Sequence, residues 1–158
     1  MSNGEYYLSD AIEVIEEILA GGGEFRMYPR GKSMLPLIVE GKDSVALKRN
    51  FENSANKFDI AFYKRDDGHY VLHRVMKIKN DGTYIMCGDN QTEFEVGIRK
   101  DQIIGYVCDV YKGEKKISVR SFWYRIYVFI WSCIFLRKLH KRGGRYLTAF
   151  KKRFLKKS

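Results

Sequence analysis

Several residue types are scarce in this chain, and each scarcity argues against a class of protein. The 158 residues include only two prolines, which argues against a long disordered region. The three cysteines, Cys87, Cys108 and Cys133, are widely spaced and form no CxxC pair. This pattern predicts neither a disulfide framework nor a zinc site, so we expect reduced core thiols in a cytosolic compartment. We also expect no cofactor and no metal.

A secretory signal and a long apolar run are missing as well. Residues 1–23 are acidic and amphipathic, without the basic start and apolar stretch of a signal peptide. The segment Ile126–Leu136 is free of charge for eleven residues, about half of the ~20 that a helix needs to cross a bilayer. We therefore expect neither a signal peptide nor a full-length transmembrane helix.

Acidic residues are almost absent from the last third of the chain. Residues 1–111 hold 14 Lys or Arg against 18 Asp or Glu, whereas residues 112–158 hold 15 against the single acid Glu114. In the second part, an apolar aromatic stretch (122–136) precedes a dense run of cations. That composition is typical of a helix lying on an anionic membrane, here on the cytoplasmic side. A helix docked on the domain with a solvated basic end, and a tail that binds nucleic acid, are the alternatives.

The remaining pattern predicts a mainly β fold with a helix at each end. Residues 1–24 read as an amphipathic helix packed on the domain, begun by Ser9 or Asp10 and ended by three glycines. Its apolar stripe comprises Leu8, Ile12, Ile15, Ile18 and Leu19. Residues 25–120 contain short strand-like runs separated by turn signals, which indicates a small β-sandwich or partly closed barrel. Residues 121–158 form the aromatic and basic tail. The predicted strands are EFRMY, DSVALK, FDIAFYK, HYVLHRVMKIK, TYIMC, QIIGYVCDVYK and KKISV.

Three short patterns in the β region carry candidate chemistry. Ser33 lies in the turn Gly-Lys-Ser-Met-Leu-Pro, and a serine hydroxyl becomes a nucleophile only beside a base. Strand alternation places His73 on the same face as Val71 and Val75, where burial would keep its imidazole neutral and able to accept a proton. His69, beside an Asp-Gly turn, is expected to be solvated. Asp89, in Gly-Asp-Asn, supplies a carboxylate of the kind that orients a histidine in a triad.

Each pattern is common by itself, but their order resembles a known family. The succession GKSMLPLI, DIAFYKR, VLHRVMKI, YIMCGDNQ and QIIGYV resembles the type I signal peptidases, which are serine endopeptidases. The match spans about residues 25–110. Because bacterial members have lysine at the position of His73, the chain resembles the endoplasmic-reticulum-type branch.

The resemblance implies roles for individual residues. Ser33 would be the nucleophile, His73 its general base and Asp89 the family's first aspartate, with Glu95 at the position of the second. The turn residues Gly31, Met34 and Pro36 would shape a pocket for small side chains of an extended precursor peptide. The backbone N–H of Ser33 would bind the oxyanion. The hydroxyl that some relatives carry two residues earlier is absent, because Gly31 occupies that position.

Two alternatives keep the fold without this activity. One is a catalytically inactive domain that binds peptides. The other is a regulatory protein akin to the self-cleaving repressors, with the basic tail on nucleic acid, although those proteins use a lysine base and no helix-turn-helix pattern precedes Ser33.

Overall fold

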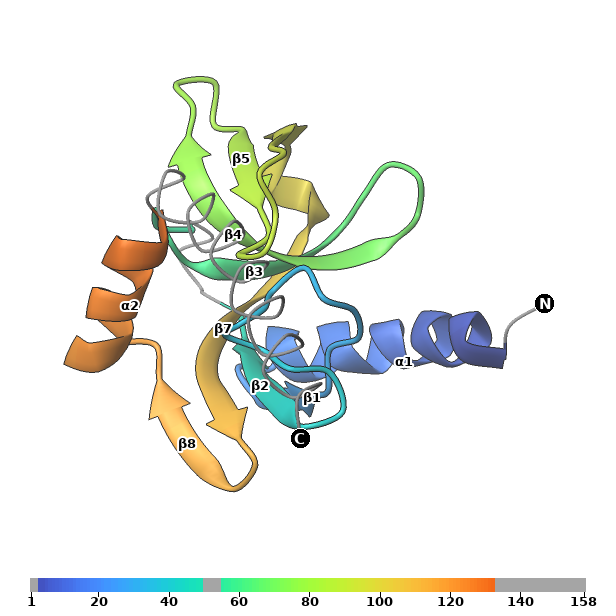
Figure 1. Ribbon diagram of the computed structural model, residues 1–158. Coiled ribbons are helices and arrows are strands. Elements are labelled where there is room, and N and C mark those ends of the chain that lie inside the picture. The colour runs from blue at the N-terminus through green and yellow to red at the C-terminus, as the bar shows by residue number, and fades with distance from the viewer. Residues whose placement is uncertain (1–2, 50–54, 133–158) are drawn as a thin grey trace, which may run out of the picture.

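The computed structural model describes residues 3–49 and 55–132, with side chains from residue 11 onward. It confirms a mainly β fold: eight strands form one antiparallel sheet, which does not close, and a helix lies at each end (Figure 1). The elements are α1 (Asn3–Ala20), β1 (Glu24–Met27), β2 (Asp43–Lys48), β3 (Ile60–Lys64), β4 (Tyr70–Ile78), β5 (Tyr84–Cys87), β6 (Glu95–Ile98), a 3₁₀ turn η1 (Lys100–Gln102), β7 (Ile103–Lys112), β8 (Lys115–Ser118) and α2 (Phe122–Ser132).

The strand order is β1-β2-β7-β3-β4-β5-β6, with β8 also paired to β7. The long strand β7 therefore joins the N-terminal pair β1–β2 to the β3–β4 hairpin, and β1 is the terminal strand on its side. All seven predicted strands are present. Strand β6 was not predicted, because its four residues include Gly97 at a positive φ of 88° and show no clear alternation.

Helix α1 is longer than predicted. It begins at Asn3, so Ser9 and Asp10 lie inside it and the prediction that one of them caps the helix is wrong. It ends at Ala20, before the three glycines, as expected. On its apolar stripe Ile12, Ile15 and Leu19 are buried, whereas Ile18 is 37% exposed, contrary to the prediction.

Helix α2 packs its inner face on the domain. Tyr124 and Val128 belong to the same buried cluster as Leu19 of α1 and Leu47 of β2, so one core runs from the first helix to the last. A second cluster on the opposite face of β3 and β4 contains Tyr63 and Val75. The outer face of α2 is exposed, and no helix among residues 3–49 and 55–132 has the length and apolarity to cross a bilayer.

Candidate active site

The predicted nucleophile and base line the same cavity. Ser33 and His73 both contribute to the wall of a pocket of about 260 Å³, together with the turn residues Gly31 and Met34. Ser33 lies half-buried in the loop between β1 and β2, and His73 extends from the middle of β4. Within the described part of the chain no hydrogen bond joins the two side chains, and such bonds are often long in enzymes without substrate. The sequence thus placed both residues at one site.

His73 is buried as predicted. Its side chain is only 2% exposed. It follows Val71 and precedes Val75 on the face of β4 that packs in the second cluster. Burial lowers the pKa of His73 below its ordinary value, and the positive charge of Arg65 lowers it further, while Glu95 opposes the shift. The imidazole is therefore neutral at neutral pH, which is the state a general base needs.

The carboxylate that contacts His73 belongs to Glu95. Its Oε1 lies 2.9 Å from Nδ1 of His73, and the Tyr63 hydroxyl lies 3.3 Å from the same nitrogen. A carboxylate accepts a hydrogen bond at this position, so Nδ1 carries the proton and Nε2 keeps the lone pair. Glu95, six residues after Asp89, is thus the carboxylate that orients the His73 ring.

Glu95 is itself held by two donors. Tyr63 donates its hydroxyl to Oε2 at 2.8 Å, and Arg65 forms a two-pronged ion pair with both oxygens. Burial opposes ionisation of Glu95, but the hydrogen bonds from Arg65 and Tyr63 outweigh it and lower the pKa of the carboxyl group. Glu95 is therefore an anion near neutral pH, with its position fixed by Arg65.

The carboxylate of Asp89 contacts Arg74, whereas the triad prediction expected it to orient His73. It is fully buried and forms a two-pronged ion pair with Arg74 at 2.7 and 2.6 Å. Because Arg74 follows His73 on β4, its side chain lies on the opposite face of the strand. Asp89 still favours the charged form of His73 through its own charge, but Glu95 and Arg65 have larger effects on that pKa. The sequence placed Asp89 in the site, but its contacts are those of a supporting residue.

The Gly-Asp-Asn segment is hydrogen-bonded to the loop that contains Ser33. The backbone N–H of Asn90 donates to the Ser33 carbonyl at 2.7 Å, and its side-chain amide donates to the carbonyl of Lys32 at 3.1 Å. A side chain on Gly88 would place its Cβ 2.7 Å from that Ser33 carbonyl. Each residue of the Gly-Asp-Asn segment thus has a structural role. Gly88 allows the close approach of the Ser33 carbonyl, Asp89 forms the ion pair with Arg74, and Asn90 hydrogen-bonds to the Ser33 loop.

Helix α2 reaches the same segment from outside. The Tyr127 hydroxyl donates to Oδ2 of Asp89 at 3.0 Å, and the Trp131 indole donates to the Asp89 carbonyl at 2.6 Å. Arg74 donates to the Tyr124 hydroxyl at 3.1 Å. A helix docked on the domain was one of the alternatives for this segment, but its partner residues could not be predicted, because an aromatic helix can pack in many ways. The consequence is a continuous hydrogen-bonded path from α2 through Asp89 to the Ser33 loop.

The cavity contains further residues that the motifs did not reveal. Arg65, Tyr70 and Gln91 line it beside Ser33. Arg65 is paired with Glu95, and Oε1 of Gln91 accepts a hydrogen bond from the backbone N–H of Gly88 at 3.3 Å. Gly31 itself has a positive φ of 92°, as a tight turn requires. Of the other pocket residues proposed, Met34 is buried, whereas Pro36 is exposed and does not line the cavity.

His69 is exposed, as its position beside a turn predicted. Its Nδ1 lies 3.2 Å from Oδ1 of Asp67. Cys87 is buried and Cys108 half-buried, and no disulfide joins these two described cysteines, while Cys133 is outside the described residues.

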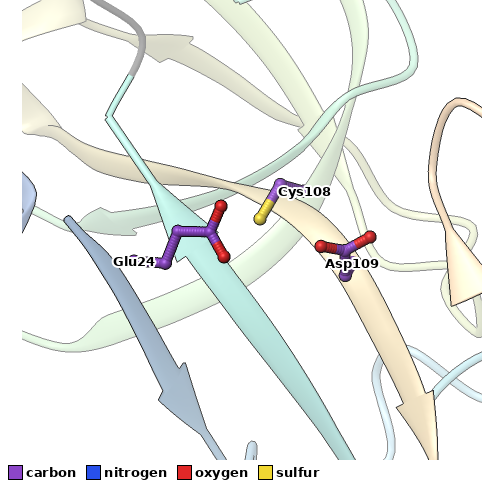
Figure 2. A group of neighbouring side chains, drawn as sticks. All are labelled: Glu24, Cys108 and Asp109. Atoms are coloured by element: carbon purple, nitrogen blue, oxygen red, sulfur yellow. The ribbon is translucent and has the colours of Figure 1, made fainter. Parts of the chain in front are cut away.

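One other cluster of potential ligands lies away from this cavity. Glu24 of β1 and the neighbouring Cys108 and Asp109 of β7 bring one ligand atom each within 4.8 Å of one another (Figure 2). Lys48 pairs with Glu24 at 3.7 Å and Lys116 pairs with Asp109 at 2.9 Å. Burial, with nearby acids, raises the pKa of the Cys108 thiol to about 11, so the thiolate that a metal would bind is disfavoured. The cluster is balanced by lysines and gives no support for a metal site.

Comparison of the chain with family models, with curated proteins and with solved structures found no match. The resemblance to the signal peptidases therefore remains a prediction from the ordered motifs.

Proposed function

We propose that this protein is a serine endopeptidase of the signal-peptidase type, which cleaves an extended precursor or leader peptide. The observation that carries the proposal is the meeting of Ser33 and the neutral, carboxylate-oriented His73 at one cavity. In this reaction Nε2 of His73 takes the proton of the Ser33 hydroxyl as Oγ attacks the peptide carbonyl. The imidazolium then protonates the leaving amine, and a water deprotonated by His73 hydrolyses the acyl-enzyme.

The shape of the site supports a peptide with small side chains. The residues that line the pocket of about 260 Å³ include Met34, Ile38 and Leu72, which are apolar and buried. This volume is slightly below the usual range of about 300–1,000 Å³ for ligand pockets, so it suits short side chains. The segment after β1, residues 29–31, lines the same pocket, and β1 is the terminal strand of the sheet order. A substrate could pair with this edge in extended form.

The direct test replaces Ser33 and His73 by alanine in the full chain. Ser33→Ala or His73→Ala should reduce cleavage of a peptide library, read by mass spectrometry, to the uncatalysed level. Ser118→Ala and His69→Ala are matched controls, because both residues lie outside the cavity and should leave cleavage unchanged. Wild-type cleavage by either site variant refutes the proposal. Peptide binding without cleavage by the unmodified protein would instead support the inactive binding domain.

We also propose that residues 121–158 associate with an anionic membrane surface. Support comes from the outer face of α2, where Phe122, Trp123 and Phe129 are 70%, 77% and 81% exposed. Exposed aromatic side chains beside cations are typical of helices that lie in the membrane interface. Flotation with vesicles containing phosphatidylserine, compared with retention on DNA at the same salt concentration, separates this partner from nucleic acid.

A further inference from the structure

A second cavity in the described part of the chain is larger than the candidate active site. It is a groove of about 790 Å³ between α2 and the strands β3 and β7. Its apolar wall includes Phe58, Ile60 and Val107 from the sheet side and Ile126 and Phe129 from the helix. A cavity of this volume is within the range that holds a drug-sized or lipid-sized apolar group.

Cations surround this apolar wall. Lys57, Arg120 and Arg125 line the groove, against the single carboxylate of Asp59, so the formal charge of the lining is positive. Burial raises the pKa of Asp59, although hydrogen bonds from Asn56 and two arginine charges oppose the shift. Within the described residues no ion pair joins Arg120 or Arg125 to a carboxylate. An apolar groove with unneutralised arginines fits a ligand that is both apolar and anionic.

We propose that this groove binds an anionic phospholipid of a bilayer, with an acyl chain along the apolar wall and its phosphate at Arg120 and Arg125. The inference rests on the membrane association proposed above, and it names the groove as the site that selects anionic phospholipids. Continuity supports it, because Phe129 lines the groove and also belongs to the exposed face of α2. A lipid in the groove would therefore lie beside the aromatic side chains that enter the interface.

Charge excludes the nearest alternatives. Residues 133–158 of this chain carry ten Lys or Arg and no acid, so their charge does not complement the positive lining of the groove. A second copy would bring two cationic linings together. Nucleic acid satisfies the arginines but offers no flexible apolar chain for the wall formed by Val107 and Ile126.

The test measures binding of the full chain to vesicles of phosphatidylcholine with and without phosphatidylserine. The double variant Arg120→Ala/Arg125→Ala should weaken binding to the anionic vesicles by about 30-fold, because each cation near an anionic surface contributes about 1 kcal/mol. Lys77→Ala/Lys100→Ala removes the same charge from exposed residues outside the groove. This control variant should lose much less affinity for the anionic vesicles.

A phosphatidylserine with a photoreactive acyl chain, placed in the same vesicles, locates the contact independently. Crosslinks should map to the groove residues Val119, Ile126 or Phe129. Crosslinks confined to residues 133–158, or equal losses in the two double variants, overturn the groove while leaving membrane association intact. If the unmodified protein binds neither kind of vesicle, membrane association and the groove both fail, whereas the peptidase proposal is unaffected.

Discussion

At the scale of single residues, the two acids near His73 differ in what they contact. Glu95 touches the imidazole directly and is held by Arg65 and Tyr63. Asp89 neutralises Arg74 on the other face of the strand and is fully buried. The first acid should therefore act on the rate and its pH dependence, and the second on stability.

Replacing Glu95 by glutamine should change the pH profile of cleavage. The carboxylate of Glu95 raises the pKa of His73, so its removal lets that pKa fall further. Because only the neutral imidazole is active, the acidic limb of kcat/KM should move to lower pH. The plateau should fall by roughly 10²- to 10⁴-fold, as when the orienting acid of a triad is lost. Glu93→Gln, an exposed carboxylate nearby, is the control. An unchanged limb and plateau would show that Glu95 has no part in the reaction.

Replacing Asp89 by asparagine should instead destabilise the fold. The substitution leaves the guanidinium of Arg74 buried without its counter-charge, which costs about 3–5 kcal/mol. Thermal unfolding followed by circular dichroism should show a Tm lower by roughly 6–20 °C. Asp66→Asn breaks an exposed pair with Arg99 and should change Tm little. A variant with wild-type Tm but no cleavage would assign Asp89 a direct role in catalysis.

At the scale of elements, the position of the Ser33 loop depends on the segment after β5. Gly88→Ala would force a Cβ against the Ser33 carbonyl at 2.7 Å and against Oε1 of Gln91 at 2.8 Å. The loop must move to relieve this contact, and a shift of about 1 Å can reduce a rate 10²-fold. We expect kcat/KM to drop on that order, with the fold retained. Gly21→Ala is the matched control, since its Cβ meets only ordinary contacts of 3.5 Å or more. Equal activity of the two variants would contradict the coupling.

Much of this architecture could be predicted from the sequence, and the exceptions have physical causes. Alternation along β4 correctly predicted that His73 lies on the buried face of the strand, because Val71 and Val75 on that face are apolar. It could not reveal the irregular pairing between Val75 and Lys77, which depends on the partner strand β5. The order of the motifs predicted that Ser33 and His73 lie at one site. Which acid contacts His73, Asp89 or Glu95, depends on side-chain geometry that the sequence does not show. The contacts of α2 are tertiary, and its aromatic composition fits a docked helix and a membrane helix alike.

At the scale of the whole molecule, one core connects both helices through the sheet. Leu19 of α1 is completely buried in the cluster that also holds Tyr124 of α2. Leu19→Ala should lower the free energy of unfolding by about 2–5 kcal/mol, while Val14→Ala, at a 53% exposed position, should have little effect. Urea unfolding monitored by near- and far-ultraviolet circular dichroism should give coincident transitions. Separate transitions would show that the helices and the sheet do not form one cooperative unit.

The indole of Trp131 stacks on Tyr127, with ring centres 5.9 Å apart, and donates to the backbone of Asp89. The chain has only one other tryptophan, Trp123, which is exposed. A Trp123→Phe variant would therefore carry a single tryptophan, whose emission can be excited selectively at wavelengths that the tyrosines do not absorb, next to the segment that hydrogen-bonds the Ser33 loop. Its emission wavelength should respond when the hydroxyl is acylated, giving an optical signal of site occupancy without any added label.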